Sequence, residues 1–420
     1  MSTEQTPLLG RRRTESLAID KASLVKEASQ MFPLAWPVSV GYLLQMSLNT
    51  AAVLALGRLG TNALASMALA TLYANVTGYS LIVGMGAAID TLCSQAFGEH
   101  LAGTGEKREL GRHLSRTIFI MYIMCIPISI LWWFTEPLLL LANQDPQIAA
   151  LSAKYTRLLI PSLFPFQCLI AGMLLAYARF VEGGDAFGGW EWKQVLNVRK
   201  LWNVTQLGVS GILMTCSEWW AWEIVALMAG ILGPEYLAAQ TIVLTSCQWA
   251  YTMPMGFSIA CTTRIGNALG AGSPYQAKLS AFAGVYLGVA LTVMNSSLFL
   301  LGRNGLGYLF SDDEKVIEIV KQMVPLVAAF QFADIQGCIC AGILRGAGRQ
   351  EIGAYLNIFG YYVFGIPIGT YVCFNLGGKL LGLWTSLTVI LFIVCFVLIY
   401  MIWRMDWDKE ADNATSDLDD

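Results

Sequence analysis

Charged residues are scarce in this chain of 420 residues. Asp, Glu, Lys and Arg make up 13% and hydrophobic residues 56%, whereas soluble domains carry about 25% charged residues. Histidine occurs only at His100 and His113, and Cys338 and Cys340 lack the spacing of a metal motif. We therefore expect no metal site and no His-based nucleophilic catalysis. The start of the chain is polar, so we also expect no cleaved signal peptide.

What the sequence does contain is a series of long apolar runs, each of about the 20 residues that a helix needs to cross a bilayer. They predict an all-α polytopic membrane protein with about ten spans. The expected spans are 32–56, 63–93, 115–141, 155–180, 207–232, 237–262, 279–301, 316–344, 352–374 and 380–403.

Lys and Arg concentrate in alternate connections between these runs, which predicts that both ends of the chain are cytoplasmic. We expect five segments in order. They are a cytoplasmic disordered head (1–30), an N-lobe of four spans (31–181), a cytoplasmic loop between the lobes (182–204), a C-lobe of six spans (205–403) and an acidic cytoplasmic tail (404–420) that is too polar to pack.

An internal repeat relates the two halves. The segment "GMGAAIDTLCSQAFG" (84–98) aligns without gaps on "GFSIACTTRIGNALG" (256–270), so that Gln95 matches Asn267 and Gly98 matches Gly270. Both segments have the same direction, which predicts two pseudo-symmetric lobes related by an axis along the membrane normal. Because the second half has six spans and the first only four, we interpret the first lobe as lacking two helices.

Two carboxylates interrupt the fifth run, "TCSEWWAWEIVALMAG" (215–230). An ionisable side chain at the bilayer centre costs about 2.5–3.5 kcal/mol, so such residues usually face a cavity and mark an ion or substrate path. Glu218 and Glu223 are five residues apart, which is about 140° around a helix. We therefore expect at most one of them to face a central cavity, and the other to be satisfied by a neighbouring helix.

Motifs spread along the chain resemble those of the multidrug and toxic compound extrusion (MATE) family, in its eukaryotic, fungal-like form. They are "DTLCSQAFG" from Asp90, "CSEWWAWEI" from Cys216, "MPMGFSIACTTRIGNALGAG" from Met253, "AGILRGAGRQ" from Ala341 and "YYVFGIPIG" from Tyr361. The resemblance implies two six-helix lobes around a central cavity, with twelve spans in the family against about ten here. It also implies exchange of a cation for an organic substrate.

By the same resemblance, Glu218 corresponds to the proton-binding acid of the family's seventh helix and Asp334 to the acid of its tenth. Trp219, Trp222 and Tyr251 fall where members line the cavity with aromatic residues. The first span has no acid, so a bacterial-type cation site is not expected there. The remaining candidates for proton or substrate binding are Glu223, Gln45 and Tyr361, and the structural motif residues are Gln95, Gly98, Asn267, Gly270, Arg345 and Gly346.

The predicted function is proton-coupled antiport of organic compounds, by efflux or vacuolar sequestration. The expected coupling ion is the proton, with no other cofactor. The expected partners are a small organic, possibly cationic, substrate and the lipid bilayer, with no nucleic acid, and the protein is expected to be a monomer. Three alternatives remain: a membrane-embedded enzyme, a lipid-linked sugar flippase of similar build, and a truncated isoform that does not transport. A flippase would favour basic residues deep in the cavity spans, and the first and fifth spans have none.

The segment "EQTPLL" near the N-terminus resembles the acidic dileucine signal that adaptor proteins read when they sort cargo to vacuoles or lysosomes. Its recognised residues would be Glu4, Leu8 and Leu9. We therefore expect an integral membrane protein of the vacuole or another endomembrane, with the plasma membrane as the second choice.

Overall fold

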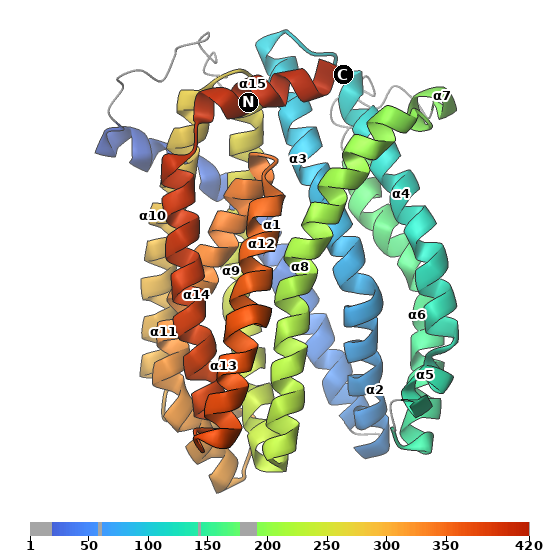
Figure 1. Ribbon diagram of the computed structural model, residues 1–420, viewed down its shortest axis with the longest axis vertical. Coiled ribbons are helices and arrows are strands. Elements are labelled where there is room, and N and C mark those ends of the chain that lie inside the picture. Colours follow the sequence, from blue (N-terminus) through green and yellow to red (C-terminus); the bar gives the residue numbers. More distant parts are fainter. Residues whose placement is uncertain (1–18, 58–60, 142–143, 177–190, 420) are drawn as a thin grey trace.

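The computed structural model describes residues 19–57, 61–141, 144–176 and 191–419, and within these ranges every regular element is a helix (Figure 1). The first half contains four long helical segments. They are α1 (Lys21–Gly57), then α2 (Thr61–Ala74) continued through the π-helical turn η1 (Asn75–Tyr79) into α3 (Ser80–Ala102), then α4 (Arg108–Trp133) with the short α5 (Thr135–Leu141), and α6 (Pro146–Ala176).

The second half contains six long segments. After the single turn α7 (Trp192–Val195) come α8 (Val198–Leu232), α9 (Pro234–Gly270), α10 (Pro274–Leu301), the turn η3 (Gly307–Leu309), and α11 (Glu314–Gly346). The ninth long segment is α12 (Gln350–Asn357) continued through η4 (Ile358–Gly365), α13 (Ile366–Thr370) and η5 (Tyr371–Asn375). The chain then forms α14 (Lys379–Arg404) and α15 (Trp407–Asp419). The ten predicted spans are therefore present as ten long helical segments.

Six of these segments in the described part of the chain are long and apolar enough to cross a membrane by length and composition alone. They are Ser66–Ala102, Arg108–Trp133, Pro274–Leu301, Glu314–Gly346, Gln350–Asn375 and Lys379–Arg404. The other four segments, α1, α6, α8 and α9, are 31 to 37 residues long. These lengths exceed the minimum of about 20 residues for a bilayer.

The repeat is visible in how the two halves contact each other. The repeated motifs lie on α3 and α9, which pack against one another, while α1 packs on α9 and α8 packs on α3. Gly84 on α3 leaves room for the backbone of α8 at Ile212, and its match Gly256 on α9 leaves room for the backbone of α1 at Ala35. Equivalent helices of the two lobes therefore cross in the same way, as a parallel repeat requires.

The polar ends of the chain are more ordered than the sequence predicts. Helix α1 begins at Lys21, inside the expected disordered head, because Asp20 accepts a hydrogen bond from the Ser23 amide. The head's first residues, 1–18, lie outside the described part. Helix α8 begins at Val198, inside the expected inter-lobe loop, because the Asn197 side chain caps it by accepting from the Lys200 amide.

The prediction that the acidic tail is too polar to pack is wrong. Trp407, Ala411 and Ala414 follow helical spacing and are buried in the same core as residues of α9 and α10. This apolar stripe outweighs the average polarity of the segment. Figure 1 shows α15 lying across one end of the bundle, where α7 and the α3–α4 connection also lie. The Lys and Arg distribution predicts that this end is cytoplasmic.

Candidate proton and substrate site

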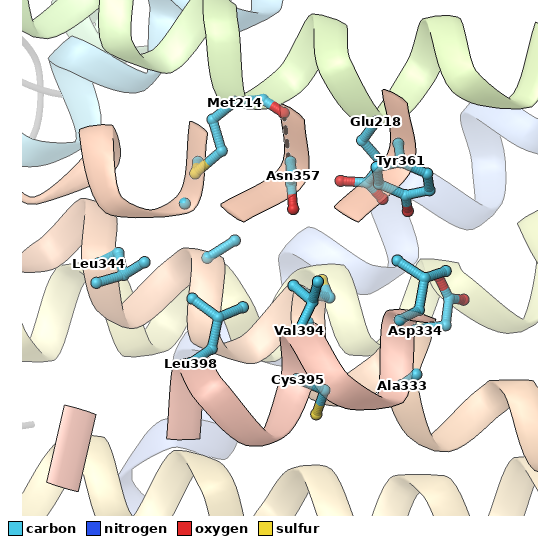
Figure 2. Close-up of a pocket in the computed structure, with 15 residues that line it drawn as sticks. Met214, Glu218, Ala333, Asp334, Leu344, Asn357, Tyr361, Val394, Cys395 and Leu398 are labelled. Atoms are coloured by element: carbon cyan, nitrogen blue, oxygen red, sulfur yellow. Dashed lines mark hydrogen bonds between the residues drawn. The ribbon is translucent and has the colours of Figure 1, made fainter. Parts of the chain in front are cut away.

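A pocket opens inside the C-lobe between α8, α11, α12 with η4, and α14 (Figure 2). Its empty volume is about 520 Å³, including the open mouth. Most of its wall is apolar or carries no charge. The lining residues are Met214, Glu218, Ala333, Asp334, Gly337, Cys338, Ala341, Leu344, Gly353, Asn357, Tyr361, Leu391, Val394, Cys395 and Leu398.

Both acids that the resemblance singled out line this pocket. Glu218 comes from α8 and Asp334 from α11, and each side chain is partly exposed to the pocket. The two carboxyl groups are close enough to interact electrostatically. The charge of Arg345, at the end of α11, also acts on Glu218. Two helices far apart in the chain thus bring the two candidate acids to one pocket, while their role in binding stays a prediction.

Tyr361 lies next to the acids and is 5% exposed. Figure 2 shows its ring beside Glu218, on the side of the pocket that faces Asp334. Tyr361 is carried by the π-helical stretch η4, where one extra residue per turn shifts the direction of the side chains. Such stretches inside α-helices are frequent at functional sites. Its hydroxyl group, which can donate one hydrogen bond, lies within electrostatic range of both acids.

Asn357 is a polar pocket residue that was not predicted from the sequence. Its Nδ2 donates to the main-chain oxygen of Met214 at 3.2 Å, which ties α12 to α8 immediately beside Glu218 (Figure 2). The α14 wall, at Leu391, Val394, Cys395 and Leu398, was missed as well. A lone polar residue in an apolar run was the available signal for Asn357. The α14 residues gave none, since apolar pocket walls and apolar helix contacts look alike in sequence.

The predicted aromatic residues divide between the pocket surroundings and the core. Tyr251 lies within electrostatic range of Glu218 and Asp334, although it is not part of the pocket wall. Trp222 packs beneath the pocket, with its ring 5.1 Å from that of Trp384 and 5.4 Å from that of Phe330. Trp219 is 37% exposed and does not line the pocket. Trp219 and Trp222 are predicted to line the cavity, but neither residue is part of the wall of this pocket.

Two further candidates lie away from the pocket. Glu223 points from α8 toward η1 and shares a hydrogen bond with the Asn75 side chain. Both acids lie on α8, where Glu218 lines the pocket and Glu223, five residues further on, is directed toward the neighbouring helical segment. Gln45 is exposed on α1 and is not part of the pocket wall. Metal ligation remains unsupported, since no group of three or more His, Cys, Asp or Glu gathers among the residues that the structure describes.

The structural motif residues meet where α3, α9 and α11 converge. The backbone of Asn267 fills the space next to Gly98, and the backbone of Gln95 fills the space next to Gly270. The Gln95 Nε2 also donates to the main-chain oxygen of Gly346 at 3.3 Å. The matched motifs thus contact each other reciprocally, and they form a close backbone contact between the two lobes.

Arg345 ends α11 just above this contact. Its Nη2 donates to Ser258 Oγ at 3.0 Å, and its main-chain oxygen accepts from Thr91 Oγ1 at 2.7 Å. The side chain thus binds α9 while the backbone binds α3. The charge of Arg345 also acts on Asp90 of α3. Arg345 therefore connects the pocket of the C-lobe with the first half of the chain.

Comparison with known protein families gives one family model, MatE, which matches residues 37–181 and 211–371. The chain is also similar to curated transporters. It is 30% identical to Protein DETOXIFICATION 16 of Arabidopsis thaliana over 94% of this chain and 92% of that protein. It is 32% identical to Multidrug and toxin extrusion protein 2 of Mus musculus over 87% of this chain and 72% of that protein.

A fungal relative and a solved structure agree with these matches. An uncharacterized transporter of Schizosaccharomyces pombe is 30% identical over 88% of this chain and 77% of that protein. The crystal structure of the eukaryotic MATE transporter AtDTX14 superposes with a TM-score of 0.84 at 26% identity. That superposition covers 94% of this chain and 100% of the other.

Proposed function

Because the chain belongs to the MatE family of membrane transporters, we propose that it exchanges protons for small organic compounds across a membrane. Members of this family are transporters rather than enzymes, so the pocket is a binding site and not a place of bond making. The observation that carries the proposal is the placement of Glu218 and Asp334, from two different helices, in one pocket.

Two carboxyl groups in one pocket can each bind a proton or, when charged, hold a cation. Ionisable residues inside a membrane mark ion and substrate paths and pair with one another. Proton uptake would remove the negative charge that retains a cationic substrate, and substrate binding would favour proton release. Tyr361 lies within electrostatic range of both acids, and its hydroxyl would donate a hydrogen bond to one of them when that acid is charged. Protons and substrate would thus compete for the same site, which is the basis of antiport.

The pocket wall supports an organic substrate. Beside the two acids, its described lining is made of apolar and uncharged side chains and carries no Lys or Arg. Apolar pockets with a few convergent polar groups are typical of small-molecule sites. A lipid-linked sugar carries phosphate groups and would favour a basic lining. The composition of this wall therefore favours the antiporter over the flippase.

We also propose that this chain is a shortened form of the antiporter. Its alignment with DETOXIFICATION 16 extends over 454 positions, which exceeds the 420 residues of the chain. The plant protein therefore has at least 34 residues without a counterpart here, the difference between 454 and 420. This excess supports the interpretation that a pair of helices is missing after α6. The proposed location is the vacuole or another endomembrane.

The test is reconstitution of the purified protein in vesicles that carry a pH gradient. We would follow a pH-sensitive dye inside the vesicles while adding tetraethylammonium as a probe cation, both for this chain and for a form with the missing helix pair restored from a relative. Proton movement that depends on the probe supports antiport. If a sodium gradient but no pH gradient drives uptake in the restored form, proton coupling is wrong. If neither gradient drives uptake of cationic or neutral probes, the antiporter proposal is wrong.

A further inference from the structure

Helix α15 is a structured cap at the end of the bundle where the two lobes meet. It contacts α9 and α10 of the C-lobe and also α3 of the N-lobe. Figure 1 shows it running from the end of α14 toward the α3–α4 connection. A segment of 13 residues at the end of the chain therefore touches both lobes.

The side of α15 that faces the bundle is well packed. Trp407 is 3% exposed, and Ala411 and Ala414 are equally buried. The three residues belong to one core with Leu269 of α9 and Ala277 of α10. Burial of a Trp side chain removes a large apolar area from water. Helix α15 is therefore packed into the hydrophobic core of the bundle and is not a loosely attached tail.

An ion pair fixes the register of α15 on the bundle. Arg349, in the turn between α11 and α12, donates from Nε to Glu410 Oε2 at 2.9 Å. Glu410 is 8% exposed, next to the buried Ala411 on the side of α15 that faces the bundle. The hydrogen bond to Glu410 raises the pKa of Arg349 above its ordinary value. A carboxylate buried at this level needs such a partner, so the two residues hold α15 in one position.

A close contact between the lobes lies next to α15, which itself contacts both α3 and α9. The α3–α9 crossing at Gly98 and Gly270 ends in the turns that α15 covers, and Gln95 binds Gly346 three residues before Arg349. Thr91 accepts a hydrogen bond from Gln350 Nε2 at 2.9 Å, which joins α3 to the residue that follows Arg349. The ion pair and the crossing are therefore parts of one assembly.

We propose that α15 is a clasp that holds the predicted cytoplasmic end of the transporter closed. It is anchored on the C-lobe by Trp407 and by the Arg349–Glu410 pair, and it reaches α3 of the N-lobe. Opening of this end separates α3 from α9, so α15 must lose its contact with one of the two lobes. The role of α15 as a clasp rests on the proposed transport function. Its contact with both lobes does not depend on transport.

Hydrogen–deuterium exchange of the intact protein in lipid nanodiscs tests the clasp without any transport assay. The variants are Arg349→Glu, Glu410→Arg and the double swap, with Lys315→Glu as the control at the opposite end. Lys315 pairs with Glu235 in an exposed position, at 2.8 Å. We expect each single reversal to increase backbone exchange several-fold in three segments: α15, residues 94–102 of α3 and residues 264–272 of α9. The double swap should restore most of the protection, and Lys315→Glu should leave all three segments unchanged.

Two results would overturn the clasp. Faster exchange confined to α15 would show that it packs on the bundle without holding the lobes together. Unchanged exchange in α15 would show that the ion pair does not hold it. If the charge reversals do not yield folded protein, Glu410→Gln gives the same comparison, since it removes the charge and keeps the shape. A failure of antiport in the vesicle assay would leave these exchange results unaffected, so the two proposals are tested separately.

Discussion

The main-chain oxygen of Asn267 occupies the space in which a Cβ atom on Gly98 would lie. The matched pair shows the same relationship, because the Gln95 oxygen occupies the space next to Gly270. Each repeat thus contributes one glycine to the crossing. It also contributes one backbone oxygen, which packs against the glycine of the other repeat. The two halves of the chain meet through equal contributions from the same motif.

This crossing predicts a steric effect of small substitutions. Gly98→Ala should lower the melting temperature of the purified protein, because an inserted methyl group must displace the backbone of α9. Overpacking of this kind costs about 1–3 kcal/mol. The matched control is Gly86→Ala on the same helix, where nothing lies within 4 Å of the new Cβ. Equal melting temperatures for the two variants would contradict the tight crossing.

The two pocket acids are expected to be required for exchange, and the third acid to be dispensable. In the form with the restored helix pair, Glu218→Gln and Asp334→Asn should each reduce pH-driven exchange to the level of protein-free vesicles, with normal expression. The control is Glu223→Gln, the same chemical change one and a half turns along α8 and outside the pocket. Wild-type rates for Glu218→Gln, or an equal loss for Glu223→Gln, would contradict the assignment.

The two acids could be predicted from the sequence because charged residues are rare within long apolar runs. Helical geometry alone separated Glu218 from Glu223, and the cost of a charge in the bilayer drew attention to both. The same reasoning could not place Trp222, since an aromatic residue beside an acid can pack in the core or line a cavity. Helix α15 was mispredicted because its average composition is polar, although Trp407, Ala411 and Ala414 form a buried stripe.

An ion pair between α1 and the C-lobe is expected to contribute strongly to stability. Glu27 is 2% exposed, and its carboxylate accepts two hydrogen bonds from Arg264, both at 2.7 Å. Gln276 and Ser280 of α10 donate to it as well, each at 2.6 Å. Glu27→Gln should therefore lower the free energy of unfolding by about 3–5 kcal/mol, because it leaves the Arg264 charge without its partner.

The matched control for Glu27 is Lys315→Met at the opposite end of the molecule. Its pair with Glu235 is exposed, with 73% of the lysine side chain accessible. Exposed pairs contribute about 0–1 kcal/mol. Denaturant unfolding in detergent can compare the two variants. A similar small loss for both would show that the Glu27 network adds little to stability.

The helix pair that we propose to be missing should limit transport even when the pocket is intact. Rocking of one lobe against the other requires both lobes to move as rigid bodies, and the first lobe has four long segments against six in the second. We expect the 420-residue form to exchange protons for substrate much more slowly than the restored form. Vesicle assays at equal protein density provide the comparison. Equal rates would show that the first lobe functions without the pair.

We expect the protein to be sorted to an endomembrane. The segment that carries Glu4, Leu8 and Leu9 lies outside the described residues, and the prediction depends on its sequence alone. Replacement of Leu8 and Leu9 by alanine should move a fluorescently tagged protein to the cell surface, since adaptors would no longer bind the signal. The control is replacement of the nearby Gln5 and Thr6, which the motif does not require. An unchanged distribution would favour the plasma membrane or another signal.

The glycine crossing lies at the end of two very long helices, and this position has a mechanical consequence. Helix α9 has 37 residues, so at 1.5 Å per residue it extends about 55 Å from the crossing at Gly270. A rigid rotation of α9 about this end would therefore move its other end the most. A rotation of about 10° at Gly270 would displace the far end by roughly 10 Å, given that length. A small rotation at the glycine crossing would thereby become a much larger displacement at the opposite end of the helix.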